Sequence, residues 1–302
     1  MFLLLAIIDK MKQKIRKAVV PVAGYGTRFL PVVKTIPKEM LPVLNKPVIQ
    51  LIVENLVEAG IKTIVLVTSS SKRAVDDYFD SHFELENKLK EAEKEKELSE
   101  IKKVAKLANI IYVRQKEMKG NGDAILCAKE AIGNEPFIVT WGDGFSYLNG
   151  DNEFSEIIKE YEKYQSIIMS GYITDKKEDT EKYGYIRGKK LKDGMVKAEK
   201  IIEKPGPMNA PSNIAIVSGF LFTPDFFGAL EKVKVKPGKE LVYVDGLNYL
   251  MEKGKDVYVK PMRSVYYDCG NILDWLKTNV DFALKRDDIK DDFKKYLIEK
   301  IK

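Results

Sequence analysis

Short apolar runs alternate with segments of helical periodicity along the first half of the chain, and this alternation restricts the fold more than any other feature. Residues 17–22 and 64–68 have the composition of buried strands. Between them, apolar side chains recur on one helical face, Asn45 can cap this helix ahead of Pro47, and Gly60 can end it. A strand, a helix and a second strand predict a right-handed β-α-β unit with parallel strands.

The same alternation continues beyond this unit. A strongly charged helical region, a strand, a helix and a further strand are predicted at residues 72–107, 110–113, 121–131 and 137–141. Shorter strand candidates follow at residues 166–172, 185–187, 196–203 and 214–222. These patterns predict an α/β fold with a doubly wound, mixed and mostly parallel sheet of the Rossmann-like kind.

The 302 residues suffice for one large domain with an appendage. We expect an α/β core at residues 11–235 and a mainly helical C-terminal extension at residues 236–302 that completes the site. Its last two helices are predicted at residues 272–285 and 289–301. The apolar run within residues 1–10 is far shorter than the roughly 20 residues of a membrane helix. Residues 1–10 are expected to be disordered or extraneous, because basic residues and the first convincing strand come after them.

Charge and residue content exclude several classes of protein. The net charge is +6, but both signs are interspersed, so we expect neither a nucleic-acid nor a membrane partner. Cys127 and Cys269 form no zinc knuckle or disulfide framework, which favours a reducing, cytoplasmic location. His82 is the only histidine, so a Ser-His-Asp triad or a multi-histidine metal site would depend on one imidazole. Chemistry that needs no histidine is therefore favoured.

A long loop follows the first predicted strand, at the edge where open α/β sheets bind ligands. Gly24 and Gly26 let backbone N–H groups approach a phosphate, Thr27 adds a hydroxyl, and Arg28 adds a planar group with five donors. Phe29 stands where a dinucleotide-binding fingerprint needs its third glycine, and the Gly-Lys-Ser/Thr of a P-loop is absent. The residues alone leave two readings, a phosphate cradle or an extended surface connection.

The full sequence of this loop is more specific. It reads Gly24-x-Gly-Thr-Arg-x-Leu-Pro31, followed by Pro37-Lys-Glu-Met-Leu-Pro42 and Lys46-Pro-x-x-Gln50. It resembles the signature of the sugar-1-phosphate nucleotidyltransferases, which make nucleoside-diphosphate sugars. The Pro-Lys-Glu-Met-Leu-Pro form is most similar to bacterial members that act on UTP and glucose 1-phosphate. The resemblance spans about residues 15–285 and implies a Rossmann-like core with a nucleotide half before a sugar-phosphate half.

The resemblance implies which residues contact the nucleotide. Val113-Arg-Gln115 followed by Gly120-Asn-Gly122 is similar to the family's nucleobase segment, where the Gln side chain and the Gly backbone read the pyrimidine edge. An amide offers a donor and an acceptor, as a uracil edge requires, although a lone Gln at a strand end is usually solvated. The implied nucleotide-binding residues are Ala23, Gly24, Gly26, Thr27, Arg28, Lys38, Gln115 and Gly120.

Two aspartates match the family's magnesium ligands. Asp143 follows the strand predicted at residues 137–141, and Asp268 lies in Tyr267-Asp-Cys-Gly-Asn271, which resembles the family's Asp-Cys-Gly motif. Either aspartate in isolation is more typical of a turn or a helix cap. The resemblance implies Mg²⁺ as the cofactor, since this ion binds one or two protein carboxylates and takes phosphate oxygens and water as its other ligands.

Two further segments resemble the sugar-phosphate site of the family. They are Tyr183-Gly184 and Ile202-Glu-Lys-Pro205. The resemblance implies that Gly184 allows close approach, Glu203 accepts hydrogen bonds from sugar hydroxyls, and Lys204 holds the phosphate of the attacking sugar. In an unrelated chain, Glu-Lys-Pro would be an exposed strand end. The catalytic groups implied by the resemblance are Arg28, Lys38 and Lys204.

Three segments depart from the family pattern. The family's Leu-Pro-Asp is Trp141-Gly-Asp-Gly144 here, its His after Gly-Leu-Gly is Asp123, and its Gln-Leu-Thr-Asp reads Val242-Tyr-Val-Asp245. The metal aspartate stays in place. The preference for base and sugar stays open at this point.

The resemblance implies that a phosphate oxygen of glucose 1-phosphate attacks the α-phosphorus of UTP in line, giving UDP-glucose and pyrophosphate. The second pKa of a phosphate monoester is about 6, so the nucleophile is anionic and no general base is needed. Thymidylyl or other nucleotidyl transfer to a different sugar 1-phosphate is the catalytic alternative, and a sugar-nucleotide-binding regulatory module is the non-catalytic one. A homodimer or homotetramer is the assembly that the family implies.

Overall fold

The computed structural model describes residues 14–147 and 151–301, so the expectation for residues 1–10 concerns a segment outside the described part. Within the described part, ten strands form the main sheet: β1 (Lys17–Pro21), β4 (Thr63–Thr68), β5 (Asn109–Arg114), β6 (Phe137–Val139), β8 (Ile167–Ile173), β9 (Gly184–Lys190), β10 (Val196–Glu203), β11 (Ile214–Ile216), β12 (Phe220–Phe222) and β13 (Val257–Met262). Two small ribbons pair β2 (Pro42–Val43) with β3 (Lys46–Pro47) and β7 (Gly144–Tyr147) with β14 (Val265–Asp268).

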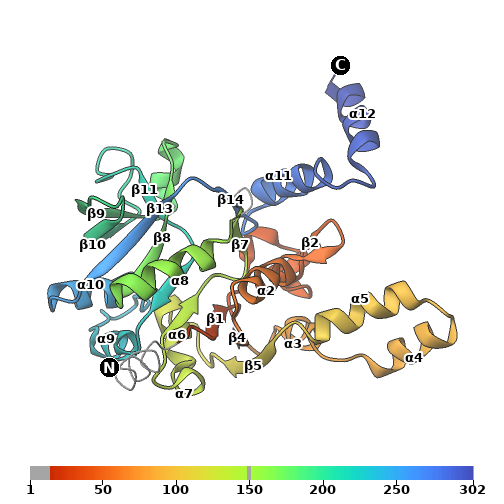
Figure 1. Ribbon diagram of the computed structural model, residues 1–302, viewed down its shortest axis with the longest axis horizontal. Helices are drawn as coiled ribbons and strands as arrows, with labels where there is room; N and C mark the ends of the chain where they lie inside the picture. The colour runs from red at the N-terminus through yellow and green to blue at the C-terminus, as the bar shows by residue number, and fades with distance from the viewer. Residues whose placement is uncertain (1–13, 148–150, 302) are drawn as a thin grey trace, which may run out of the picture.

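Helices cover the sheet and extend from it (Figure 1). The described α-helices are α2 (Val48–Glu58), α3 (Arg73–Tyr78), α4 (Phe83–Glu91), α5 (Glu95–Ala105), α6 (Asn121–Cys127), α7 (Lys129–Ile132), α8 (Glu153–Tyr164), α9 (Asp225–Lys232), α10 (Tyr243–Glu252), α11 (Ile272–Ala283) and α12 (Lys290–Ile301). The long loop after β1 is made of short 3-10 turns, η1 (Thr27–Phe29), η2 (Val32–Lys34) and η3 (Lys38–Met40), and η4 (Lys177–Glu181) follows β8.

The order of strands in the main sheet is β11-β9-β10-β13-β8-β12-β6-β1-β4-β5. β1 pairs in parallel with both β4 and β6, and β4 pairs in parallel with β5, as the predicted alternation requires. Of the ten described strands of the main sheet, only β10, β11 and β12 run against the others. The prediction of an α/β fold with a mixed, mostly parallel sheet is therefore confirmed.

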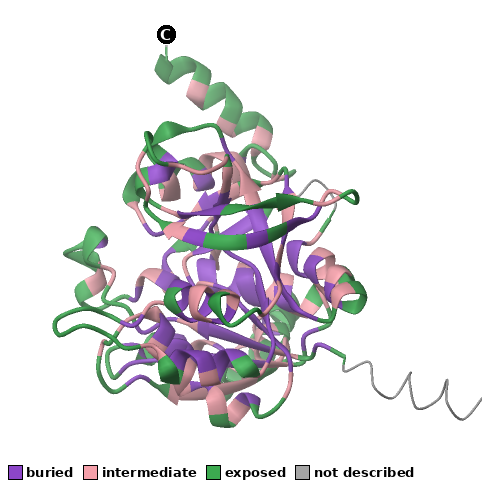
Figure 2. Ribbon diagram, turned by 90° about the vertical axis from the view of Figure 1, so that its left-hand side faces the viewer, coloured by how far each residue is buried: buried purple, intermediate pink, exposed green. Residues whose placement is uncertain are grey.

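Alternate residues of the central strands bury opposite faces of the sheet. In β1, Val19 belongs to one hydrophobic cluster, while Ala18 and Val20 belong to another. α6, α9 and α10 pack in the first cluster, and α2 and α8 pack in the second. Figure 2 shows the buried residues concentrated along the sheet and on the inner faces of these helices. Helices on both faces explain why the strands of the first half are almost entirely apolar.

The segment at residues 236–302 contributes more to the core than expected. It contains α10, α11 and α12, but also β13, which lies between β8 and β10 in the main sheet. The division expected after residue 235 thus differs from the arrangement found, because a central strand comes from the later segment. α12 extends away from the body (Figure 1), as does the hairpin of α4 and α5. Among the described helices, none combines the length and the apolar character needed to span a bilayer.

The start of α2 also differs from expectation. Its N-cap is Pro47, with no side-chain cap hydrogen bond, whereas Asn45 Oδ1 accepts a hydrogen bond from Arg286 Nη1 at 2.8 Å. The reason is the pairing of β2 with β3, which places Asn45 in the turn of a ribbon rather than at the helix end. The strand predicted at residues 214–222 is two strands, β11 and β12, separated where Gly219 adopts a φ of 72°.

Candidate active site

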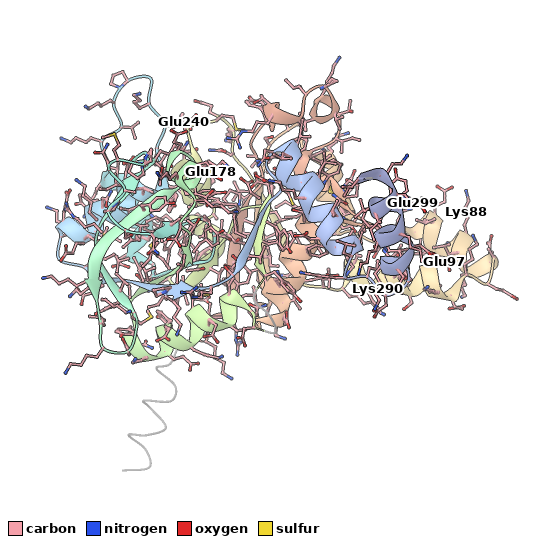
Figure 3. The ribbon with its side chains drawn as sticks, turned by 90° about the horizontal axis from the view of Figure 1, so that it is seen from above. Lys88, Glu97, Glu178, Glu240, Lys290 and Glu299 are labelled. Carbon is pink, nitrogen blue, oxygen red and sulfur yellow. The ribbon has the colours of Figure 1, made fainter. Side chains whose placement is uncertain are left out.

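Two cavities lie beside the loop that follows β1. The smaller, of about 390 Å³, is lined by residues that include Ala23, Gly24, Gly26, Thr27, Lys38, Gln115, Gly120 and Asp143. The larger, of about 680 Å³, is lined by residues that include Arg28, Tyr183, Lys204 and Asp268. Glu240 and Glu178, which line the smaller and the larger cavity respectively, lie at the same end of the molecule, far from Lys88 and Glu97 of the α4–α5 hairpin (Figure 3).

Asp143 and Asp268 come from opposite halves of the sequence and meet between the cavities. The β7–β14 ribbon pairs Asp268 with Gly144, the residue after Asp143. A Cβ atom on Gly270 would lie 2.8 Å from Asp143 Oδ2 and 2.9 Å from Asp268 Oδ1, so the two carboxylates converge on one point. The Gly270 N–H donates to Asp268 Oδ1 at 2.9 Å, and the Tyr183 hydroxyl donates to Asp268 Oδ2 at 3.3 Å.

The charges at this point are strongly coupled. Burial, followed by the nearby charge of Asp143, raises the pKa of the Asp268 carboxyl above its ordinary value. Lys38 Nζ donates a hydrogen bond to Asp143 Oδ2. Burial alone would lower the pKa of the Lys38 ammonium, but the carboxylates of Asp143, Glu39 and Asp268 outweigh it and raise that pKa. Two carboxylates outnumber the one ammonium group beside them, so a bound cation would stabilise their negative charge.

The donors at this point fit a hard divalent cation. In residues 14–147 and 151–301, no group of three or more His, Cys, Asp or Glu side chains is arranged to hold a metal ion. Two converging carboxylates are sufficient for an ion such as Mg²⁺, which completes its coordination with phosphate oxygens and water. The site therefore fits an ion that binds together with a phosphate-bearing substrate.

The loop after β1 is anchored to the neighbouring strand β4. The Val22 N–H donates to Val67 O at 2.9 Å, and Ser69 Oγ donates to Ala23 O at 3.3 Å. Gly26 has a φ of 65°, which favours glycine, and a Cβ there would lie 3.2 Å from the Lys38 side chain. A Cβ on Gly24 would meet no atom within 4 Å, so this backbone faces open space. An anchored loop with open backbone is suited to binding phosphate.

Gln115 is held in one orientation. Its side chain is 5% exposed, and its Nε2 donates to Gly120 O at 3.1 Å and to Asp123 Oδ2 at 2.8 Å. A carbonyl and a carboxylate only accept hydrogen bonds, so the amide nitrogen must face them and Oε1 must face the other way. Asp123, one of the departures from the family pattern, thus orients the predicted base-reading side chain.

The predicted sugar-phosphate residues lie on β9, β10 and the turn after β10. Glu203 pairs with Gly184 across these strands, and a Cβ on Gly184 would lie 3.0 Å from Glu203 Oε2. Among the described residues that line the two cavities, Lys204 is present, whereas Gly184 and Glu203 are not. Lys204 has a φ of 46°, uncommon for a residue with a side chain, and its N–H donates to Tyr183 O at 3.1 Å. Such strained residues often lie at functional sites.

Two residues near the site were missed in the sequence. Tyr266 lines the larger cavity, and its hydroxyl lies so close to Gly144 that a Cβ there would be 2.2 Å away. Lys72 forms a buried ion pair with Glu39 of the Pro-Lys-Glu-Met-Leu-Pro motif. No motif indicated Tyr266, but a lysine as the first residue of a predicted helix was a signal for Lys72, because helix N-termini disfavour cations.

Comparisons with known proteins identify the family of this chain. Residues 17–284 match the family model described as nucleotidyl transferase. A putative UTP–glucose-1-phosphate uridylyltransferase of Methanocaldococcus jannaschii is 43% identical over 95% of this chain and 99% of that protein. A UTP–glucose-1-phosphate uridylyltransferase of Streptococcus pneumoniae is 39% identical over 96% of this chain and 97% of that protein.

Solved structures of similar sequence and fold include two proteins of the same kind. A UTP-bound UGPase from Acinetobacter baumannii is 34% identical, with a TM-score of 0.86 over 94% of this chain and 99% of that one. A UDP-glucose pyrophosphorylase complexed with UDP-glucose is 37% identical, with a TM-score of 0.80 over 90% of this chain and 100% of that one. The chain therefore belongs to the nucleotidyl transferase family.

Proposed function

We propose that this chain transfers a uridylyl group from UTP to glucose 1-phosphate, forming UDP-glucose and pyrophosphate. The convergence of Asp143 and Asp268 between the two cavities carries this proposal. One cavity has the phosphate loop and Gln115, which suit a nucleoside triphosphate, and the other has Lys204, which suits a sugar phosphate. The activity named for the relatives, and the UTP and UDP-glucose named with the solved structures, support the same substrates.

In this mechanism the protein acts by positioning and by neutralising charge. The backbone of Gly24 and Gly26 and the side chain of Lys38 line the nucleotide cavity and hold the triphosphate. Arg28 lines the larger cavity beside Lys204, so in this mechanism it reaches the triphosphate from the side of the sugar phosphate. Lys204 holds the sugar phosphate so that its oxygen faces the α-phosphorus in line with the leaving pyrophosphate. The nucleophile is already anionic, since the second pKa of a phosphate monoester is about 6.

The one histidine is not required for this chemistry. His82 is exposed at the N-cap of α4, where its Nδ1 accepts a hydrogen bond from the Leu85 N–H at 3.3 Å. Its position is thus explained by helix capping. A reaction driven by cations and backbone donors agrees with this arrangement.

Mg²⁺ is the cofactor that we propose for Asp143 and Asp268. Bound between them, it would neutralise charge on the phosphate oxygens of the nucleotide. Lys38 holds Asp143 by a hydrogen bond and so keeps one carboxylate directed at this position. The hard oxygen donors and the convergence of two carboxylates, one from the lining of each cavity, support this proposal.

A mutation of Gln115 tests the base preference. Gln115 Nε2 donates to Gly120 O and Asp123 Oδ2, which leaves Oε1 to face the base. There Oε1 would accept a hydrogen bond from the N3–H of uracil, whereas N3 of cytosine has no hydrogen to donate. Gln115→Ala should therefore reduce the ratio of kcat/KM for UTP to that for CTP, by roughly tenfold for one lost hydrogen bond. Steady-state kinetics with both nucleotides measure this ratio. An unchanged ratio would show that Gln115 does not read the base.

The assembly and the location are proposed on separate grounds. We propose a homodimer or homotetramer, supported by exposed apolar side chains on α11 and α12, namely Ile272, Leu273, Leu276, Ile298 and Ile301. Light scattering measures the mass, and a monomer at micromolar concentration would contradict it.

The free thiols of Cys127 and Cys269 support a reducing, cytoplasmic location, which fractionation of the source cells tests.

One assay tests the function. The protein is incubated with Mg²⁺, each common nucleoside triphosphate and several sugar 1-phosphates, and pyrophosphate release is measured. We expect the highest kcat/KM with UTP and glucose 1-phosphate. Faster release with a thymidine nucleotide or another sugar would support the catalytic alternative instead. Tight binding of sugar nucleotides without any release would support the regulatory module.

A further inference from the structure

A buried ion pair lies next to the phosphate loop, and the mechanism above does not use it. Lys72 Nζ lies 2.7 Å from Glu39 Oε2, and the two side chains are 3% and 1% exposed. By contrast, the pair of Lys260 and Glu160 leaves its side chains 28% and 16% exposed. A fully buried ion pair is often no more stabilising than apolar residues of the same size, so stability alone is a poor reason for its presence.

Local preference opposes the position of Lys72. It stands at the N-cap of α3, without a side-chain cap hydrogen bond. A cation is disfavoured at a helix N-terminus, where the backbone dipoles already place partial positive charge. A residue that breaks a local rule in this way points to a tertiary or functional reason. Here that reason is the contact with Glu39.

Glu39 is next to both partners of the Lys38–Asp143 contact: it follows Lys38 in the chain, and its side chain packs against Gly142, which precedes Asp143. Its neighbour in η3 is Lys38, whose ammonium donates to Asp143. A Cβ on Gly142 would lie 3.2 Å from Glu39 Cγ, so the Glu39 side chain packs against the residue before Asp143. η3 has no side-chain cap hydrogen bond of its own. The ion pair is thus a side-chain anchor for this turn.

The other end of the anchor reaches the phosphate loop. Lys72 follows β4 in a tight turn, in which its N–H donates to Ser69 O at 3.1 Å. Ser69 Oγ in turn donates to Ala23 O at 3.3 Å. The turn from Ser69 to Lys72 therefore contacts the loop after β1 through Ala23 and the η3 turn through Glu39.

We propose that the Glu39–Lys72 ion pair positions Lys38 and the Ala23 loop for the triphosphate, and thereby determines how well UTP binds and reacts. The inference rests on the proposed function. Both side chains act through Lys38 and Ala23, so they are positioning residues. Their removal should affect UTP and leave glucose 1-phosphate nearly unaffected, because Lys204 lies in the turn after β10 and lines the other cavity.

The test uses the full chain with both charges removed together. Glu39→Gln with Lys72→Met leaves no unpaired buried charge and is therefore expected to fold. We expect kcat/KM for UTP to fall about 10- to 100-fold, since a displacement of about 1 Å can cost 100-fold, while KM for glucose 1-phosphate changes less than twofold. Calorimetry with Mg²⁺ and UTP alone should show weaker binding. Lys72→Arg, which keeps a cation, should retain more activity than the double variant.

Two controls separate the possible outcomes. Lys260→Met also removes an ion pair but lies on β13, and we expect wild-type kcat and KM. A folded double variant with wild-type kinetics and UTP binding would overturn the proposal, because the pair would then be structural only. Equal losses for UTP and glucose 1-phosphate would overturn it as well. If the wild type releases no pyrophosphate, the proposed function fails, and UTP binding by the same variants still tests the positioning role.

Discussion

Asp143→Asn should lower turnover by at least about 10²–10³-fold, the loss typical when one preorganised charge-stabilising group is removed. The substitution keeps the size of the side chain but removes the charge that faces Asp268 and accepts from Lys38. A neutral amide binds a divalent cation less well than a carboxylate does. The loss should appear in pyrophosphate release at saturating UTP and glucose 1-phosphate, and added Mg²⁺ should restore only part of it.

A matched variant makes this result interpretable. Asp193 lies in the exposed turn between β9 and β10 and pairs with Lys163, so Asp193→Asn removes a carboxylate outside the two cavities. We expect wild-type turnover from it. Near-normal activity of Asp143→Asn, at any Mg²⁺ concentration, would exclude Asp143 as a metal ligand.

Gly120→Ala should destabilise the protein by about 2–4 kcal/mol, the sum of a strained backbone and an overpacked contact. Gly120 has a φ of 107°, and a Cβ there would lie 2.3 Å from the backbone oxygen of Leu241. The chain cannot easily yield, because Leu241 O also accepts from the Gly122 N–H at 2.9 Å. Thermal or denaturant unfolding measures the loss.

The same substitution should weaken UTP binding. Gly120 O accepts from Gln115 Nε2, so moving this backbone disturbs the amide that we propose reads the base. Gly194→Ala is the control, because Gly194 has a φ of 88° but a Cβ there would meet no atom within 4 Å. It isolates the cost of the backbone conformation. A Gly120→Ala protein that loses no more stability than Gly194→Ala would contradict the predicted clash.

Local rules account for the expectations that were confirmed. β1, β4 and β6 were predicted because both of their faces are buried, which makes their sequences almost entirely apolar, and the edge strand β5 was predicted because its central residues are apolar and partly buried. β13 was missed for the opposite reason. Its Tyr258 and Lys260 are only partly buried, and Pro261 stands within it, so its sequence does not read as a central strand. Its place between β8 and β10 depends on partners distant in sequence.

The candidate site divides in the same way. Gly24, Gly26 and Arg28 could be recognised in the sequence because phosphate binding needs these residue types close together in one loop. The resemblance to a known family supplied Asp143 and Asp268, since nothing in their local sequences connects them. Asp123 was seen only as a departure, and its hydrogen bond to Gln115 became visible once the helix and the strand end were placed together.

The order of apolar and polar residues by itself determined the α/β class and predicted the phosphate loop, because periodicity and loop chemistry act over a few neighbouring positions. Only the tertiary structure decided that two aspartates on paired strands converge beside Gly270 and that Lys72 reaches Glu39. Strand pairing and burial bring together residues separated by long stretches of chain, and the free energy of these contacts is set by surroundings that no local segment contains.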